Sequence, residues 1–159
     1  MARIYSNSKR VFSDVIPLML GMWPTPLVKL TKLSDEKFEL WAKLEFYNPF
    51  SRSIKDRPVW NMIRKALEED RLKDKLYEAT SGNVGIAMAC LANFFNRKFR
   101  AYIPKPTPKV TEVLLRVLGA EIVRTEYVTI DMNLIRYVEK EAEKDGASNL
   151  NPVSYTHLT

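Results

Sequence analysis

The sequence predicts an α/β protein with a mostly parallel sheet and flanking helices. Strand-like and helix-like segments alternate four times along the chain, which is typical of this class. The run from Val84 to Phe95 is apolar nearly all round, which suits a helix buried between layers, and it is too short to cross a membrane. With 159 residues, 46% hydrophobic and 28% charged, the chain has the composition of an ordinary globular domain.

The first elements lie around a proline-rich entry. Residues 1–22 show no clear periodicity. Residues 23–30 are expected to be extended, because each proline biases its predecessor towards β or polyproline geometry. Between Phe38 and Phe46 apolar residues recur at every second position, and this alternation predicts a half-buried strand.

The remaining elements follow in strand–helix order. Asp56 is a suitable N-cap, and Pro58 a suitable first-turn residue, for a helix with one apolar face. Glycines just past two later helices predict their ends. The expected segments are the helix up to residue 67 with apolar positions 59, 62, 63, 66 and 67, a strand at 76–77, a helix at 84–95, a strand at 99–103, a helix at 109–118, a strand at 121–124 and a helix at 132–144.

Composition narrows the class of protein. One cysteine and one histidine leave neither an internal disulfide nor a plausible zinc or other metal site, so we expect a reducing, cytoplasmic setting. The apolar part of the longest uncharged run is too short for a membrane span, so we expect no membrane segment. Cys90 is interpreted as core packing. The net charge of +6 raises nucleic-acid binding as a rival hypothesis. We interpret the main basic cluster as a solvated rim around the end of a strand, and we expect no nucleic-acid partner. The cluster comprises Lys98, Arg100, Lys105 and Lys109.

Two loops between a strand and a helix carry unusual chemistry. In the loop 48–57, Lys55 lies at the start of a helix, where the positive end of the helix dipole favours a neutral, nucleophilic amine suited to a Schiff base. In the loop 78–85, Thr80, Ser81 and Asn83 surround Gly82 before the buried helix. Hydroxyls and N–H groups at a helix start favour an anion such as a carboxylate or phosphate.

Together these loops resemble the cysteine synthase and cystathionine β-synthase family of pyridoxal-phosphate enzymes, which has the tryptophan-synthase-β-like fold. Residues 23–30 resemble the family's Asn-Thr-Pro-Leu-Val entry. Residues 48–57 resemble its Asn-Pro-Thr-Gly-Ser-Val-Lys-Asp-Arg loop, and residues 78–85 its Glu-Pro-Thr-Ser-Gly-Asn-Thr-Gly loop. The three segments in this order and spacing form a specific signature.

The resemblance implies a role for each loop residue. Lys55 would bind the cofactor, pyridoxal 5′-phosphate, covalently and shuttle protons, and Asn83 would donate a hydrogen bond to the 3′-oxygen of the cofactor. Thr80, Ser81 and Gly82 would hold the α-carboxylate of a small amino-acid substrate. The implied reaction is β-replacement, in which O-acetylserine or O-phosphoserine reacts with sulfide to give L-cysteine, in a homodimeric full-length protein.

The chain departs from the family pattern at two positions. Val84 stands where the family commonly has threonine, and Ser51-Arg52 replace Thr-Gly. Arg52 could pair bidentately with a phosphate on the substrate, which suggests a preference for O-phosphoserine. Cystathionine β-synthase, threonine synthase and dehydratase activities stay open as alternatives, as does a non-catalytic anion-binding α/β module.

The carboxyl-terminal part of the family pattern is absent from this sequence. The family's glycine-rich, phosphate-binding loop lies further along, whereas Gly146 is the only glycine after Gly119. Residues 152–159, which include His157, resemble the translation of a transposon mosaic end used in sequencing libraries. We therefore expect residues 1–151 to be the amino-terminal part of an incomplete catalytic region with an adapter-derived tail, and little or no activity from this chain.

Overall fold

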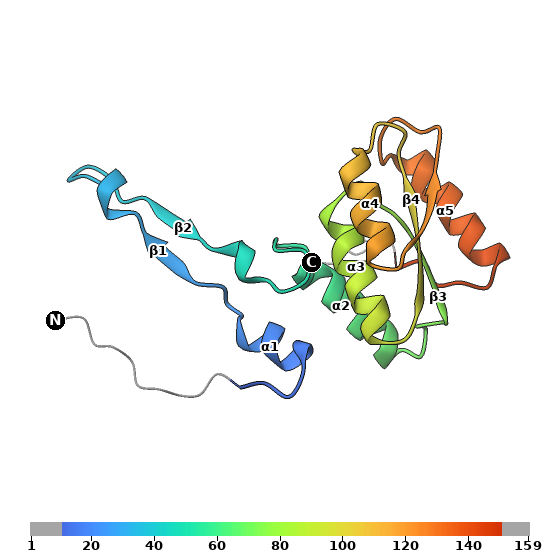
Figure 1. The fold of residues 1–159 in the computed structure, drawn as a ribbon, viewed down its shortest axis with the longest axis horizontal. Helices are drawn as coiled ribbons and strands as arrows, with labels where there is room; N and C mark the ends of the chain where they lie inside the picture. The colour runs from blue at the N-terminus through green and yellow to red at the C-terminus, as the bar shows by residue number, and fades with distance from the viewer. Residues whose placement is uncertain (1–10, 151–159) are drawn as a thin grey trace. The chain divides into compact units, whose positions relative to one another are not determined.

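The chain divides into two compact units, Met1–Pro49 and Phe50–Thr159. The computed structural model describes residues 11–150 of them (Figure 1). Within this described range, no helix is long and apolar enough to cross a lipid bilayer. The predicted tail at 152–159 lies outside the described residues, so its origin stays a prediction.

The first unit contains a short helix and a two-stranded antiparallel sheet. Helix α1 (Val15–Gly21) begins after Asp14, whose side chain caps it, and lies in a region without a predicted element. Strand β1 (Leu27–Lys29) pairs with β2 (Trp41–Lys43). The predicted half-buried strand from 38 to 46 was therefore too long. Phe38 and Phe46 are exposed, so the alternation does not mark a buried face of this unit.

The second unit contains the parallel sheet, with strand order β3-β4-β5. Backbone hydrogen bonds join Ser148 to the free edge of β3, through Tyr77 N and Lys75 O. The elements are α2 (Asp56–Glu68), β3 (Lys75–Ala79), α3 (Asn83–Phe94), β4 (Lys98–Ile103), α4 (Lys109–Val117), β5 (Glu121–Arg124) and α5 (Met132–Lys144).

Helices cover both faces of the parallel sheet. Helix α5 packs on β3 from one side, while α3 and α4 pack on β4 and β5 from the other, and α2 packs against α3 (Figure 1). On the α5 side, Tyr77 and Tyr102 of the strands bury against Leu134 and Val138 of the helix. This arrangement confirms the predicted α/β class, although the predicted first strand belongs to the separate antiparallel pair.

The helix ends follow the expected local chemistry. Gly119 and Gly146 have φ values of 81° and 62°, in the left-handed region that glycine tolerates, just after α4 and α5. Asp131 caps α5 by accepting hydrogen bonds from the backbone of Asn133 and Leu134, both at 3.0 Å. Leu67 is more exposed than its predicted core position implies, at 40%.

A buried carboxylate fixes the loop that follows β4. Arg124 on β5 donates to the carbonyl oxygen of Lys105 at 2.6 Å and to that of Thr107 at 3.3 Å. The same guanidinium binds Glu112 of α4 at 2.6 Å, and Arg116 binds it at 3.0 Å. Glu112 therefore connects α4, β5 and the loop 104–108 into one rigid corner.

Acidification tests the contribution of this corner to stability. Hydrogen bonds from Arg124 and Arg116 lower the pKa of Glu112 to about 2. Because this folded-state pKa lies below the unfolded one, the carboxylate stabilises the fold near neutral pH, and that contribution fades as the pH falls through the acidic range towards the folded-state pKa. Between about pH 6 and about pH 3, the urea concentration at the unfolding midpoint should fall less for Glu112→Gln than for the parent protein. Equal losses in the variant and the parent would contradict this role.

Candidate active site at the carboxyl ends of the strands

The buried carboxylate of Asp56 organises the loop that carries Lys55. Asp56 is fully buried and accepts hydrogen bonds from the backbone N–H groups of Phe50 and Ser51, both at 2.8 Å. The Ser51 hydroxyl donates to it as well. Asp56 is the first residue of α2, where the helix dipole also stabilises a negative charge. The predicted N-cap is corrected: Asp56 binds back to the loop and does not cap the helix.

Lys55 itself occupies the N-cap position of α2, with φ −75° and ψ −17°. Its backbone N–H donates to the hydroxyl oxygen of Ser53 at 3.1 Å, and the hydroxyls of Ser51 and Ser53 lie 2.9 Å apart. The backbone at Lys55 is therefore fixed from both sides, by the serine pair before it and by the helix after it. This confirms the predicted position of the lysine at a helix start.

The second loop, which connects β3 to α3, is tightly packed at Thr80 and Gly85. Thr80 is buried, and its hydroxyl accepts a hydrogen bond from Gly85 N at 2.8 Å. A Cβ atom on Gly85 would lie 2.6 Å from Thr80 Cγ2 and 3.2 Å from Leu115 Cδ2. Gly85 is thus required for close packing. Gly82 is different, because a Cβ atom there would meet nothing within 4 Å.

The two loops line one cleft of about 300 Å³. Lys55 forms one part of its wall, and the residues from Ala79 to Val84 form another. Among the described residues, the side chains of Lys55, Ser81 and Asn83 have no hydrogen-bond or ion-pair partner. The structure therefore brings together five of the predicted site residues, which are Lys55, Thr80, Ser81, Gly82 and Asn83.

A neighbouring pocket of about 280 Å³ shares Ser81 and Ile130 with this cleft. Its other lining residues come from the loops after β4 and β5, such as Thr107 and Thr129. These loops were not predicted as part of the site, because neither carries a recognisable binding or catalytic motif. Their position was nevertheless foreseeable, because the loops at the carboxyl ends of parallel strands share one edge of a sheet.

Arg52 does not line the cleft. It is exposed, and its φ of 53° lies in the left-handed region, where the family pattern has glycine. The substrate contact expected of Arg52 stays a prediction. Cys90 is half-buried, and burial together with the Asp56 charge raises the pKa of its thiol, which disfavours a nucleophilic thiolate. His157 lies outside the described residues.

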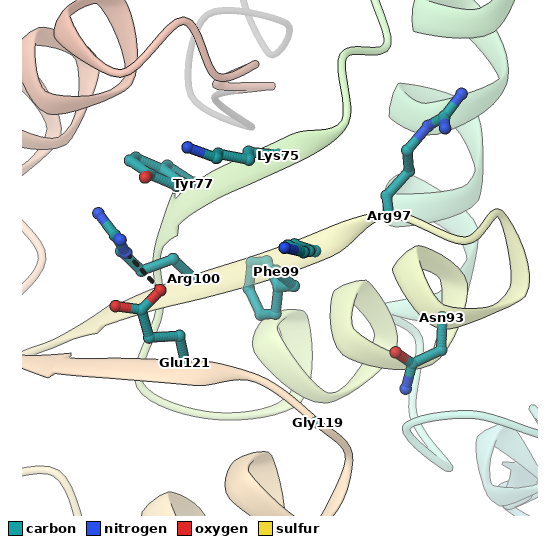
Figure 2. Close-up of a pocket in the computed structure, with 9 residues that line it drawn as sticks. Lys75, Tyr77, Asn93, Arg97, Phe99, Arg100, Gly119 and Glu121 are labelled. Atoms are coloured by element: carbon teal, nitrogen blue, oxygen red, sulfur yellow. Dashed lines mark ion pairs between the residues drawn. The ribbon is translucent and has the colours of Figure 1, made fainter.

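A third pocket, of about 350 Å³, lies at the opposite, amino-terminal end of the strands (Figure 2). Its central cation, Arg100, forms ion pairs with Glu121 at 2.8 Å and Asp145 at 3.1 Å, and lies 4.4 Å from the centre of the Tyr77 ring. Tyr77 donates a hydrogen bond to Asp145 at 2.7 Å. Burial and this bond raise the pKa of Tyr77. The charge of Arg100 is thus largely neutralised by its neighbours, which favours a structural role for this residue.

Comparison with known proteins agrees with the cleft chemistry. The family model described as "Pyridoxal-phosphate dependent enzyme" matches residues 18–158. The chain belongs to this family. The match includes both cleft loops, and it favours the enzyme interpretation over a non-catalytic anion-binding module.

Two relatives with similar sequences are a cysteine synthase and a cystathionine beta-synthase, as the loop motifs predict. The chain is 40% identical over 102 residues to cysteine synthase B of Salmonella typhimurium, which covers 62% of this chain and 33% of the relative. It is 43% identical over 104 residues to cystathionine beta-synthase of Dictyostelium discoideum, covering 64% of this chain and 21% of the relative. The chain thus spans a third or less of these two proteins.

The fold also matches solved structures. The crystal structure of O-ureido-L-serine synthase superposes with a TM-score of 0.80 at 27% identity, covering 88% of this chain and 44% of that protein. The predicted family and fold are therefore confirmed. The members named here differ in their products, so membership does not by itself determine the substrate of this chain.

The cleft residues fit the family's cofactor. The open space in front of Gly82 admits a ligand, and the first-turn amides of α3 at Asn83 and Val84 line the cleft as potential donors to an anion. The lysine amine, a carboxamide and a hydroxyl face the cleft without competing protein partners among the described residues. Such a donor set suits a pyridine aldehyde and an amino-acid carboxylate.

The two glycines of the second loop give a matched test of this packing. We expect Gly85→Ala to destabilise the fold by about 1–3 kcal/mol through overpacking against Thr80 and Leu115. Gly82→Ala should change the free energy of unfolding by less than about 0.5 kcal/mol, because its Cβ would enter open space. Urea unfolding measures both. A Gly82→Ala loss as large as that of Gly85→Ala would contradict the assignment of an open cleft.

Proposed function

We propose that the complete protein forms L-cysteine by β-replacement from an activated serine, O-acetylserine or O-phosphoserine, and sulfide. In this reaction a C–S bond replaces the C–O bond at the β-carbon, and the acetate or phosphate leaves. The observation that carries the proposal is the single cleft that holds Lys55 beside residues 80–84. The similarity to cysteine synthase B supports the choice of reaction.

Each cleft residue has a proposed task. Lys55 Nζ holds pyridoxal 5′-phosphate covalently and moves the proton at the substrate α-carbon. Asn83 donates a hydrogen bond to the 3′-oxygen of the cofactor, and the loop from Thr80 to Gly82 binds the α-carboxylate through its hydroxyls and N–H groups. The bound cofactor supplies an electron sink, while the protein supplies position and electrostatics.

The buried Thr80 hydroxyl accepts a hydrogen bond from Gly85 N, which fixes the position of its oxygen and leaves its O–H free to donate. We therefore assign carboxylate binding to the Thr80 and Ser81 hydroxyls together with the loop backbone. Val84 lines the same cleft without adding a hydroxyl. By analogy with the family, we expect the complete protein to form a homodimer in the cytoplasm.

A second candidate is the cystathionine β-synthase reaction, which the 43% identity to the Dictyostelium protein favours. The two reactions differ in the nucleophile, which is sulfide in one and a thiol-bearing amino acid in the other. Supplying each nucleophile in turn and identifying the product by mass spectrometry separates them. L-cysteine formed faster from sulfide supports the cysteine synthase reaction, and a thioether product formed faster overturns it.

Lysine replacement tests the cofactor site. With the protein expressed from its complete gene, we expect added pyridoxal phosphate to produce a visible-edge absorbance band that Lys55→Ala abolishes. The matched control is Lys140→Ala, which removes an exposed lysine of α5 remote in sequence from both loops. A band that survives in Lys55→Ala would contradict the proposed attachment, as would a band equally lost in both variants.

The variant Arg52→Gly tests two expectations with two measurements: the backbone strain at this position and the preferred substrate. Because its φ of 53° is unfavourable for a side-chain-bearing residue, Arg52→Gly should raise stability by about 1 kcal/mol. If Arg52 pairs with a substrate phosphate in the complete protein, the same variant should lower kcat/KM for O-phosphoserine relative to O-acetylserine by roughly tenfold. An unchanged ratio of the two kcat/KM values would rule out the phosphate preference proposed for Arg52.

A further inference from the structure

Helix α4 presents an apolar stripe to solvent. Val110, Val113, Leu114 and Val117 follow one another at helical spacing and are exposed by 74%, 47%, 40% and 77%. Residues with this spacing lie on one face of a helix. A single exposed apolar side chain needs no explanation, but three valines and a leucine aligned on a helix of nine residues form a continuous apolar surface.

This stripe is separate from the face that α4 needs for folding. The inner face of the helix is formed by Leu115 and Glu112, which are 0% and 6% exposed. It packs towards β5 and α3, and Glu112 completes the corner with Arg124. The helix therefore has a packed inner face, with Leu115 and the buried Glu112, and an outer apolar face that contributes little to the packing of this unit.

One side of the stripe is strongly basic. Lys109 and Arg116, seven residues apart, lie along one flank of the helix, with side chains exposed by 78% and 56%. The only carboxylate among them is Glu112, which is nearly buried and is shared by Lys109, Arg116 and Arg124. Three cations against one anion leave this flank positive. The opposite flank, with Thr111 and Leu118, is uncharged.

We propose that α4 is a docking surface for an amphipathic helix of a partner protein. That helix has an apolar face that covers the apolar stripe and a row of Asp or Glu residues that meets Lys109 and Arg116. Helix packing through residues at i, i+3, i+4 and i+7 is a common mode of recognition. Opposite charges along the flank set the orientation and accelerate association.

The charges argue against an antiparallel pair of α4 helices from two copies of this chain. In an antiparallel two-fold pair of α4 helices, each flank faces its own symmetry mate. Lys109 and Arg116 would then approach the same residues of the other copy, and like charges there oppose association. An acidic partner instead neutralises the flank. The inference does not depend on the reaction performed at Lys55.

The test uses the protein expressed from its complete gene and two synthetic amphipathic helices of roughly 20 residues. Both peptides present leucines on one face, and they differ only in having glutamate or lysine along the flanks. Fluorescence anisotropy should show roughly tenfold tighter binding of the glutamate peptide, and a Kd that rises with salt. Val113→Glu combined with Val117→Glu should abolish binding, and Lys109→Glu should weaken it.

The control is Val11→Glu, which introduces a single glutamate at a valine 81% exposed in the other unit, and it should bind like the parent. Circular dichroism confirms that each variant retains its helices. Equal binding of the two peptides, or of neither, would overturn the proposal. Concentration-dependent self-association in sedimentation that Val113→Glu removes would also overturn it, and would assign the stripe to a second copy.

Discussion

The position of Lys55 depends on one buried charge. The Asp56 carboxylate is closed to solvent, and a buried charge is tolerated only when its oxygens are satisfied by hydrogen bonds. Phe50 N and Ser51 N, together with the Ser51 hydroxyl, supply these bonds. Satisfying Asp56 therefore folds the loop 50–55 against the start of α2, and the neighbouring Lys55 is carried to the edge of the sheet.

The parallel sheet supplies the other half of the site. Because β3, β4 and β5 run in the same direction, their following loops converge on one edge. The first of these loops gives Thr80 to Gly82 and the start of α3, and the corner around Glu112 and Arg124 holds the second. The cleft is thus bounded by backbone that is fixed by hydrogen bonds on two sides, and its polar side chains are free to bind a ligand.

Much of this site could be predicted from the sequence, because its signals are local. Lys55 next to a helix start, and the Thr80–Gly85 turn before an apolar helix, each have a short-range cause. β5 and α5 were predicted with their observed bounds, since each has clear periodicity and a clear end. The actual role of Asp56 was not predictable in this way. Its hydrogen-bond partners precede it in a loop whose path depends on tertiary packing.

The incorrect prediction of a long strand also comes from tertiary packing that the local sequence does not specify. Between residues 38 and 46, alternation predicted a buried face, but only residues 41–43 pair with another strand, and Phe38 stays exposed. Pattern alone does not specify what a strand pairs with or what covers it. The same holds for α4, where packed and exposed apolar residues together give a broad hydrophobic pattern. Only the structure separates the packed residues, such as Leu115, from the exposed valines.

The central claim is that the cleft places one particular lysine against the cofactor. Borohydride reduction of the pyridoxal-phosphate-loaded protein, followed by peptide mass mapping, tests this claim most directly, because reduction makes the covalent attachment permanent. We predict the added pyridoxyl mass on the peptide that contains Lys55 and on no other lysine peptide. Attachment at a different lysine, or distributed over several surface lysines, would contradict the account.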